Sequence, residues 1–399
     1  MFESVFYRAL DRNRNGALVV SHAGKERQLG SLNERPIARI NVNDKRFFRD
    51  CILFGEVGFG EAFTDGLWSS PDPLAVIDWF ANNAASTPTF ASNAANPILV
   101  NALGIADRIR YMLRPNSIRT SKKNIRDHYD LGNDFFQLFL DETMAYSCAV
   151  FKEPSEALLS AQHNKFDRLY EKLNLNQNDH LLEIGCGWGG FAIHAAQKSG
   201  CRVTGITISQ QQFEFAKRRV REEHLEDQIE IRFQDYREVQ GKFDKIVSIE
   251  MMEALGYKYL DVFFSRCHQL LRPGGTMALQ CITFPDASYE SYRKGMDWTR
   301  IHIFPGSLLL SVQGMLYSLK KTGNLMLEDV ESIGLHYART LAIWCENFLK
   351  NSGQVHSLGF SDDFLRKWQY YFMFCEAGFS NRLINDIQMV LHAPGRRSI

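Results

Sequence analysis

Four glycines within six residues, in GCGWGG at 185–190, form the part of the sequence with the clearest chemical use. The apolar run HLLEI precedes this loop, and an amphipathic stretch closed by Gly200 follows it. Glycine lets the backbone approach a ligand at the start of a helix, where unpaired amide groups are available. The loop therefore favours a cofactor site over a plain strand–helix turn, although dinucleotide-binding enzymes use similar loops.

Three acidic residues lie in or beside apolar runs. Glu183 ends the run before the glycine loop, where a carboxylate can accept a hydrogen bond from an ammonium group. Glu253 follows DKIVSIEMM, and a buried carboxylate is costly there unless it is paired or functional. Glu250 belongs to the same run. It pairs either with the cofactor or with a Lys or Arg, and its role is open.

The glycine loop lies in a region where strands and helices alternate, from about residue 180. This alternation predicts a parallel sheet with helices on both faces. After it, residues 283–323 read as irregular, and two further strands and two helices follow. The predicted strands are 180–185, 201–208, 229–235, 244–251, 276–282, 324–334 and 386–393; the predicted helices are 191–200, 210–224, 259–275 (ended by Pro273 and Gly274), 336–351 and 362–379.

The residues before this region predict a small α+β unit and a linker. Residues 37–42 read as a strand, and Asp44 is placed to cap the helix after it. Residues 82–99 have a linker-like composition. Residues 107–126 contain seven basic residues and one acidic residue, so this segment is either a solvated linker or a contact with anionic lipid headgroups.

The composition excludes several classes of protein. With 46 basic and 46 acidic residues, the chain has no global field for a polyanion such as nucleic acid. Eight cysteines without a CxxC pair read as free thiols in a reducing compartment, and they make a zinc ribbon unlikely. No apolar run is long enough to span a membrane, and no signal peptide is recognised, so we expect a cytoplasmic protein. The 29 phenylalanines suit a large apolar cavity or a thick core.

The sequence resembles S-adenosylmethionine-dependent methyltransferases, in particular the family of cyclopropane-fatty-acyl-phospholipid synthases and mycolic acid cyclopropane synthases. The resemblance implies an α/β fold with a Rossmann-like, seven-stranded methyltransferase sheet and helical lid insertions, plus a small α+β N-terminal domain. The implied domains are a lipid-handling domain at 1–90, a basic linker at 91–125 and the methyltransferase at 126–399. The matching segments are HYDLGNDFF, YSCAVF, LLEIGCGWGGFA, GITISQQQ, QDYR, DKIVSIEMMEALG, HIFPG and HYARTLAIWCENF.

The resemblance also assigns residues to the cofactor S-adenosylmethionine. Thr207 and Gln212 lie where other methyltransferases place a ribose-binding acid, and Asp235 and Tyr236 fall beside the adenine. As alternatives, Thr207 is simply a strand end and Tyr236 a core aromatic. The remaining implied cofactor contacts are Tyr146, Ser147, Glu183, Gly185, Gly187 and Gly189.

The family holds a bicarbonate ion as its base, and its ligands match Cys148, Glu253, the backbone of Ile282, and Tyr337. A further cysteine associated with activity matches Cys375, for which a small buried hydrophobe is an equal alternative. Gln280 stands where the bacterial enzymes have a histidine. Glutamine can donate a hydrogen bond to an anion but does not titrate, so bicarbonate binding is open here. In Gln280 and in PDASYESYR at 285–293 the chain is nearer the plant-like branch.

The implied reaction is transfer of a methylene or methyl group to the cis double bond of unsaturated acyl chains in membrane phospholipids. The alternatives are a fatty-acid C-methyltransferase that leaves a methyl branch without ring closure, a soluble methyltransferase for small molecules, and a non-catalytic lipid-binding protein. The expected partners are these acyl chains and the anionic inner face of the membrane, bound peripherally. No nucleic acid is expected, and a homodimer is open.

Overall fold

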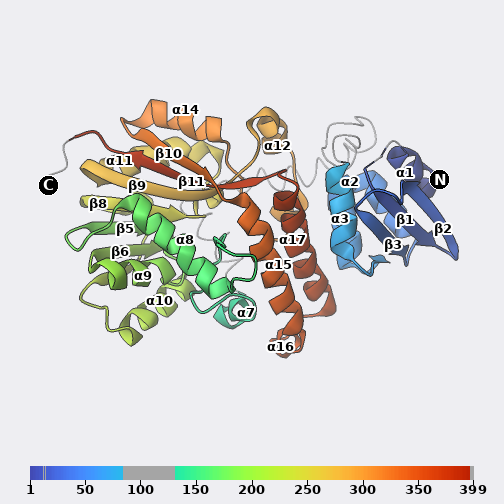
Figure 1. Cartoon of the computed structure of the whole chain (residues 1–399), viewed down its shortest axis with the longest axis horizontal. Helices are drawn as coiled ribbons and strands as arrows, with labels where there is room; N and C mark the ends of the chain where they lie inside the picture. The colour runs from blue at the N-terminus through green and yellow to red at the C-terminus, as the bar shows by residue number, and fades with distance from the viewer. Residues whose placement is uncertain (12, 14, 84–130, 396–399) are drawn as a thin grey trace. The chain divides into compact units, whose positions relative to one another are not determined.

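The computed structural model describes residues 1–11, 13, 15–83 and 131–395 (Figure 1). The predicted linker at 91–125 and nearly all of its basic segment lie outside these ranges. The chain divides into two compact units that are not continuous in sequence. The first contains the described residues of Met1–Arg114, Ala287–Pro305 and Leu341–Leu383, and the second contains those of Pro115–Asp286, Gly306–Thr340 and Ile384–Ile399.

The first unit combines a four-stranded sheet with helices. Its strands lie in the order β2-β1-β3-β4, with β1 and β3 parallel and the other pairs antiparallel. The predicted strand at 37–42 is confirmed as β3, and Asp44 accepts a hydrogen bond of 2.8 Å from the amide of Arg46, where α2 begins. The elements are α1 (Phe2–Leu10), β1 (Ala17–His22), β2 (Lys25–Gly30), β3 (Ile37–Val42), α2 (Arg46–Thr64), β4 (Trp68–Ser69), α3 (Pro73–Asn82), α12 (Tyr289–Lys294), α13 (Trp298–His302), the end of α15 (Gly334–Lys350), α16 (Ser352–Ser357) and α17 (Asp362–Ser380).

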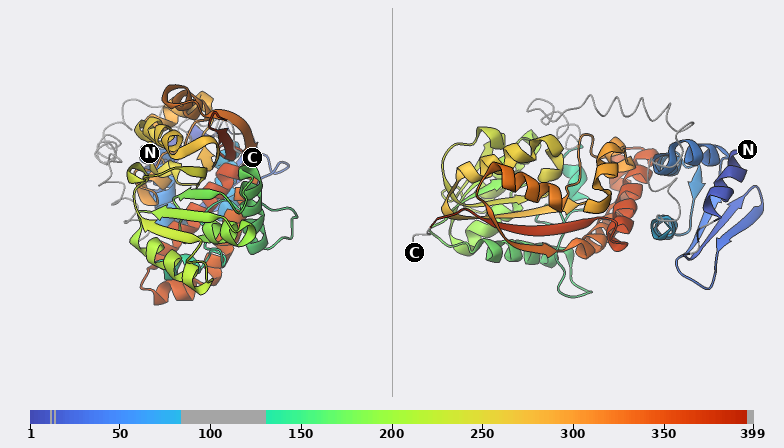
Figure 2. Two further views of the ribbon diagram at one scale, coloured as in Figure 1. Left: turned by 90° about the vertical axis from the view of Figure 1, so that its left-hand side faces the viewer. Right: turned by 90° about the horizontal axis from the view of Figure 1, so that it is seen from above.

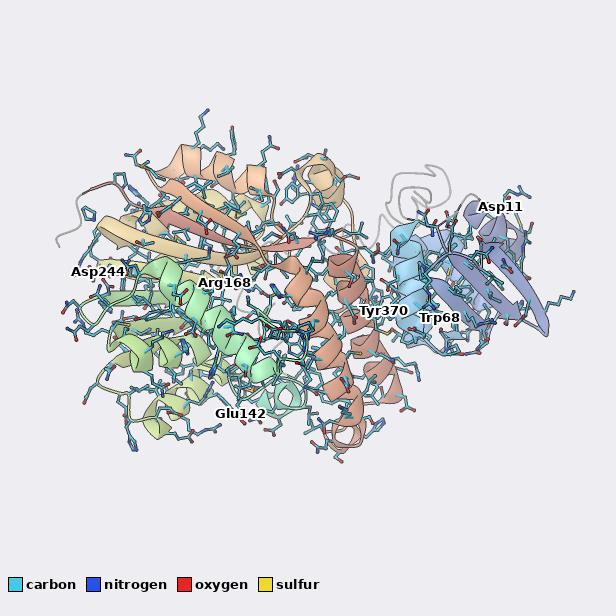
Figure 3. All side chains as sticks on the ribbon, viewed as in Figure 1. Asp11, Trp68, Glu142, Arg168, Asp244 and Tyr370 are labelled. Atoms are coloured by element: carbon cyan, nitrogen blue, oxygen red, sulfur yellow. The ribbon has the colours of Figure 1, made fainter. Side chains whose placement is uncertain are left out.

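Aromatic side chains fill the core of the first unit. Trp68 packs 4.7 Å from Phe59 and 4.8 Å from Phe63, measured between ring centroids, and Tyr370 of α17 packs 5.9 Å from Phe63. Figure 3 labels Trp68 and Tyr370 among the side chains of this unit. Phe47 and Phe48 are also fully buried. Much of the phenylalanine content of this unit therefore forms a thick core.

The second unit contains the seven-stranded sheet, which confirms the predicted fold class. The strand order is β10-β11-β9-β8-β5-β6-β7; the five strands from β9 to β7 are parallel, β11 runs antiparallel to its neighbours β9 and β10, and β10 therefore runs in the same direction as the five. The elements are α7 (Asn133–Gln137), α8 (Leu158–Leu173), β5 (His180–Ile184), α9 (Gly190–Ser199), β6 (Arg202–Thr207), α10 (Gln210–Glu222), β7 (Ile229–Phe233), β8 (Phe243–Ile249), α11 (Leu260–Leu270), β9 (Leu271–Thr283), α14 (Val312–Thr322), β10 (Met326–Ser332), the start of α15, and β11 (Asn385–His392).

Helices cover both faces of this sheet. Helices α8, α9 and α10 share one buried apolar cluster with the strands, and α11 and α14 share another. Figures 1 and 2 show these helices as separate layers. On α8, Arg168 (labelled in Figure 3) pairs with Glu331 of β10 at 2.7 Å. Both layers follow from strands that are apolar on both sides, as is usual for parallel sheets.

Two expectations about this region were wrong. The helix predicted at 259–275 ends at Leu270, because Leu271 has the extended backbone of a strand (φ −69°, ψ 141°), and Pro273 and Gly274 belong to the start of β9. Residues 283–323 are not irregular throughout, because they contain α14. Ser311 caps α14 by accepting from the amide of Gly314 at 2.9 Å, and Met315 and Leu319 bury one face at helical spacing.

No helix among the described residues has the length and apolar character needed to cross a membrane.

The apolar layer of α11 provides a test of this packing. Phe263 is fully buried, and its neighbour Val262 is 43% exposed. We expect Phe263→Ala to lower the free energy of unfolding by about 3–5 kcal/mol, because it removes a large side chain and leaves a cavity. The matched control Val262→Ala should change it by about 0.5 kcal/mol or less. Urea unfolding followed by circular dichroism measures both, and equal losses would contradict the assigned layer.

Candidate active site

The glycine loop follows β5 and leads into α9 at the carboxyl edge of the parallel strands, where α/β proteins bind ligands. Gly185, Gly187 and Gly189 have φ values of 81°, 53° and 85°. The amides of Gly185 and Cys186 both donate to the carbonyl of Ile206 at 3.0 Å, which ties the loop to β6. A Cβ atom at Gly187 would meet no protein atom within 4 Å, so the loop is open at this point.

A buried carboxylate lies beside this loop. Glu183 is 2% exposed, and its Oε2 atom accepts no hydrogen bond from the described residues. Burial raises the pKa of Glu183 to about 8, although Lys165 and the amide of Ala192 oppose the rise. An unpaired carboxylate oxygen suits a ligand that brings a positive or hydrogen-bond-donating group. The open loop and this oxygen together fit S-adenosylmethionine.

The next predicted cofactor contacts lie at the ends of β6 and β7. The hydroxyl of Thr207 donates to Gln212 Oε1 at 2.9 Å and accepts from the amide of Ser209 at 3.2 Å. Asp235 is 2% exposed and accepts two hydrogen bonds from the guanidinium of Arg237, at 2.7 and 2.8 Å. These side chains satisfy one another, and their contact with a cofactor stays a prediction.

Tyr236 lies in the apolar core, as its alternative interpretation as a core aromatic describes. Its ring packs 5.5 Å from Phe263 within the apolar cluster of α11. Burial raises the pKa of the phenol well above its ordinary value. The residue therefore serves the core, whatever contact a neighbouring cofactor makes with it.

Residues 146–148 run past a buried lysine. The ring of Tyr146 packs 5.4 Å from Phe136 and 6.0 Å from Phe139. Ser147 accepts a hydrogen bond of 2.7 Å from the ammonium group of Lys165 on α8. Lys165 is fully buried, and burial lowers its pKa while the neighbouring Glu250 raises it. Lys165 is the positive charge of this part of the site.

Glu250 lies at the centre of the site. Its Oε1 atom accepts hydrogen bonds of 2.8 Å from the backbone amide of Cys148 and 2.8 Å from Gln280 Nε2, and its Oε2 atom accepts one of 2.6 Å from the hydroxyl of Tyr337. The residue has φ 48°, a left-handed conformation that side chains other than glycine seldom adopt. The side chain of Met251, the next residue, would lie 2.8 Å from a Cβ atom at Gly185, so the segment that carries Glu250 adjoins the glycine loop.

Glu253 is the second carboxylate of the site. Its Oε1 atom accepts a hydrogen bond of 2.5 Å from the amide of Ile282, and its Oε2 atom has no hydrogen-bond partner among the described residues. Burial raises the pKa of Glu253 to about 8, and the charge of Glu250 adds to the rise. Glu253 is therefore mostly neutral at pH 7.

The predicted bicarbonate ligands come together here, but their donors are already used. The amide of Cys148, the amide of Gln280 and the hydroxyl of Tyr337 all bind Glu250, and the amide of Ile282 binds Glu253. A bicarbonate ion does not fit among these groups as they are arranged. The Glu250 carboxylate accepts the hydrogen bonds of Cys148, Gln280 and Tyr337 in this arrangement.

The two predicted site cysteines differ. Cys148 contributes its backbone amide, while burial raises the pKa of its thiol. Cys375 belongs to α17 of the first unit, where burial raises its thiol pKa. A thiol with a raised pKa is a poor nucleophile at neutral pH, so neither cysteine is activated. All eight cysteines are free, as predicted.

Three polar residues of the site were missed by the sequence analysis: Lys165, Asp386 and Gln388. Gln280 Nε2 also donates to Asp386 at 3.1 Å, and Gln388 Nε2 donates to Gln280 Oε1 at 3.0 Å. Asp386 and Gln388 lie two residues apart in β11 and are both fully buried. Two polar residues on one face of an otherwise apolar strand were the available signal.

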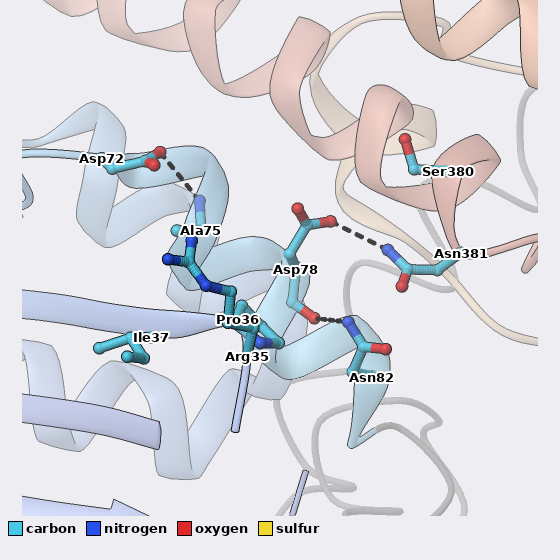
Figure 4. A pocket seen from close by; sticks show the side chains of 9 residues that line it. All are labelled: Arg35, Pro36, Ile37, Asp72, Ala75, Asp78, Asn82, Ser380 and Asn381. Carbon is cyan, nitrogen blue, oxygen red and sulfur yellow. Dashed lines mark hydrogen bonds between the residues drawn. The ribbon is translucent and has the colours of Figure 1, made fainter. Parts of the chain in front are cut away.

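A separate pocket in the first unit, of about 540 Å³, lies between the start of β3, α3 and the end of α17 (Figure 4). Its two carboxylates have structural partners: Asp72 caps α3 through the amide of Ala75, and Asp78 accepts from Asn381 at 2.9 Å. The pocket has no group with an evident catalytic use.

The chain is similar to known proteins over most of its length. A family model described as mycolic acid cyclopropane synthetase matches residues 116–389. The chain is 36% identical to the tuberculostearic acid methyltransferase of Mycobacterium tuberculosis, over 86% of this chain and 80% of the relative. It is 33% identical to the cyclopropane-fatty-acyl-phospholipid synthase of Escherichia coli K12, over 90% and 88%. A solved mycolic acid cyclopropane synthase with SAH (S-adenosylhomocysteine) and CTAB matches at 31% identity and a TM-score of 0.64, covering 68% of this chain and 98% of its own.

The open position at Gly187 generates a prediction about ligand binding. In Gly187→Ala the new methyl group meets no protein atom, so the fold should lose only about 1–2 kcal/mol from the left-handed backbone. The methyl group enters the space assigned to the cofactor, and we expect the affinity for S-adenosylhomocysteine to fall at least tenfold. Gly241→Ala is the matched control, with φ 106° and open space but no place in the loop. Calorimetry showing equal affinities would contradict the assignment.

The raised pKa of Glu253 predicts a pH-dependent stability. The folded protein keeps a proton on Glu253 up to about pH 8, whereas the unfolded chain releases it above its ordinary pKa of 4.5. The resulting stability is complete below 4.5 and is lost as the pH rises through about 8. We expect Glu253→Gln to reduce the fall in unfolding free energy across this window, by up to about 1.4 kcal/mol per pH unit. Chemical unfolding at several pH values measures the slope.

Glu222→Gln, an exposed change on α10, is the control and should leave the slope as it is. If Glu253→Gln gave the same slope as the natural chain, Glu253 would not be the buried proton-binding group.

Proposed function

Because the chain belongs to the mycolic acid cyclopropane synthetase family, we propose that it transfers a one-carbon unit to the cis double bond of unsaturated acyl chains in membrane phospholipids. The chain is an S-adenosylmethionine-dependent methyltransferase that acts on lipids. The observation that carries the finer proposal is Glu250, a half-buried carboxylate held by three donors beside the glycine loop. This geometry suits a base at the reacting carbon.

The reaction needs a base because ring closure releases a proton. The alkene loses no proton before it attacks, so this proton must leave afterwards. S-adenosylmethionine supplies an electrophilic methyl group. The π electrons of the double bond would form the new C–C bond to this methyl carbon as its bond to sulfur breaks, so that S-adenosylhomocysteine leaves and a carbocation remains on the acyl chain. Glu250 then takes a proton from the added methyl group, and the electrons of that C–H bond close the three-membered ring. One proton thus passes from the acyl chain to Glu250.

Charge and exposure favour Glu250 over Glu253 as the base. Three hydrogen bonds stabilise the negative charge of Glu250, whereas Glu253, with its pKa of about 8, holds its proton at pH 7. Glu250 is also half-buried, so one side of the residue remains accessible. In this proposal Glu253 contributes a neutral carboxyl that binds the backbone of Ile282.

Names of relatives support the lipid substrate and define the alternative product. The Escherichia coli relative is a cyclopropane-fatty-acyl-phospholipid synthase, which supports a phospholipid and, for the same reason, peripheral binding to the membrane face. The Mycobacterium tuberculosis relative is a tuberculostearic acid methyltransferase, which supports a C-methylated chain without a ring. In forming the second product, the carbocation would lose a proton without closing the ring, and the electrons of that C–H bond would leave a double bond beside the branch.

The proposal is tested with purified protein, S-adenosylmethionine and vesicles that contain oleoyl phospholipids. We expect the acyl chains to gain one CH2 unit, detected by mass spectrometry, and cyclopropane protons to appear in the NMR spectrum. Glu250→Gln should lower the rate about 10²- to 10⁴-fold, because the amide cannot take the proton. Affinity for S-adenosylhomocysteine should stay unchanged, and Glu222→Gln, an exposed change on α10, is the control.

The dependence of the rate on bicarbonate distinguishes this mechanism from the one implied by the resemblance. Removal of dissolved bicarbonate should leave the rate unchanged, because Glu250 occupies its donors. A rate that fell without bicarbonate would assign the base to the ion and contradict the role of Glu250. An added CH2 unit without cyclopropane protons would instead support the unringed product, and no added CH2 on any unsaturated lipid would overturn the proposed function.

A further inference from the structure

Asp386 is a buried acid next to the proposed base, and neither the motifs nor the reaction assigns it a role. It lies near the start of β11, opposite Ile282 in β9, and is fully buried. A single nitrogen, Gln280 Nε2, donates both to Asp386 Oδ2 at 3.1 Å and to Glu250 Oε1 at 2.8 Å. The two carboxyl groups therefore meet at one amide.

The position of Gln280 is fixed from its other side. Gln388 Nε2 donates to Gln280 Oε1 at 3.0 Å, so the amide oxygen of Gln280 faces Gln388 and its nitrogen faces the two acids. That nitrogen has two hydrogens, and the carbonyl of Cys148 at 3.3 Å is a third acceptor. Gln280 cannot satisfy two ionised carboxylates and this carbonyl at once.

The charges around Asp386 also exclude a second negative charge. Glu250 and Glu253 are acids of the same cluster, and Lys165 on α8 is its buried cation. Two adjacent carboxylates cannot both ionise in such a site without a large energetic cost. Burial, the charges of Glu250 and Glu253 and a hydrogen bond to Glu250 raise the pKa of Asp386, and Lys165 opposes this only in part. The other titratable groups at the cluster are Cys148, Cys281 and Tyr337.

The hydrogen bonds show which acid keeps the proton. Glu250 accepts from a backbone amide, a side-chain amide and a phenol, whereas Asp386 accepts from Gln280 and from the Cys148 thiol, which is a weak donor, and its Oδ1 atom has no partner among the described residues. Donors stabilise the ionised form. The negative charge therefore rests on Glu250 and the proton on Asp386.

We propose that Asp386 is a positioning residue that keeps its proton and donates a hydrogen bond to Glu250, so that the pair carries one negative charge on the base. This inference rests on the proposed function. The donated hydrogen bond fixes the position of the Glu250 carboxylate. When Glu250 takes the proton of the added methyl group, Asp386 keeps its own and the pair becomes neutral.

Asp386→Asn separates this role from that of an ionised Asp386. The asparagine amide can donate to Glu250 while its oxygen accepts from Gln280, so the variant imitates the protonated acid. We expect the rate of this variant to stay within about threefold of the natural enzyme. The acid limb of its pH–rate profile should stay in place or move to higher pH, because an amide donates a weaker hydrogen bond than a carboxylic acid. Asp386→Ala, which removes the donor, should lower the rate at least tenfold and move the acid limb of the pH–rate profile to still higher pH.

An ionised Asp386 predicts the opposite sign. A negative charge would then lie beside the base in the natural enzyme, and Asp386→Asn, which removes that charge, would move the acid limb of the pH–rate profile to lower pH. That shift would overturn the proposal. A rate loss in Asp386→Asn as large as that of Glu250→Gln would also overturn it, because it would make Asp386 the base.

Infrared spectroscopy tests the protonation without turnover and without a substitution. In the natural protein labelled with ¹³C at its aspartate carboxyls, we expect the carbonyl band of a protonated carboxylic acid to shift at neutral pH. Absence of a shifted band would contradict the proposal, even if Asp386→Asn failed to fold. Because this readout needs no lipid substrate, its failure is distinguishable from failure of the proposed function.

Discussion

The second unit depends on one constraint, which is the placement of the Glu250 carboxylate. Hydrogen-bond donors from separate parts of the chain surround this carboxylate. The backbone of Cys148, the amide of Gln280 and the hydroxyl of Tyr337 lie far apart in sequence, yet all bind one carboxylate. A carboxylate in such a site is costly unless several donors are fixed around it. The residue itself adopts a left-handed conformation, φ 48°, a strain that functional sites commonly store.

The strand order of the sheet brings these donors together. Strands β5, β8, β9 and β11 are consecutive neighbours in it. The glycine loop leaves β5, Glu250 follows β8, Gln280 lies in β9, and Asp386 is the second residue of β11. The amide of Glu250 donates to the carbonyl of Gln280 at 2.8 Å, so the acid and its bridging amide are also joined through the backbone. One edge of one sheet thus carries the cofactor loop, the base and its supports.

The sequence was sufficient for the features that local pattern controls. Apolar runs predicted all seven strands of this sheet, and the spacing of glycines predicted the loop. Pattern failed at α11, where an extended Leu271 ends the helix before Pro273, and it missed α14 behind its Ser311 cap. These errors concern boundaries that depend on neighbouring strands more than on local composition.

The site was predictable only in part, because its hydrogen bonds join residues that lie far apart in sequence. Glu250 and Glu253 were both recognisable as acids beside an apolar run, but their donors lie at 148, 280, 282 and 337. Which acid receives three donors and which receives one depends on tertiary contacts. Asp386 joined the site only through the antiparallel register of β11 on β9, which sets Gln388 opposite Gln280. No local property of DIQMVLH reveals that pairing.

Gln280 is best understood together with Glu250. Where the anion is an exchangeable ion, a histidine beside it can supply charge and adjust to the protonation of the ion. Here the anion is part of the chain, and a group that titrated beside it would alter the charge of the base with pH. A glutamine gives hydrogen bonds of fixed polarity, and Gln388 fixes its orientation. The neutral amide of Gln280 and the carboxylate of Glu250 therefore act together. In the proposed arrangement the protein carries its own anion at Glu250. Gln280 hydrogen-bonds both to this anion and to Asp386, which holds the adjacent proton.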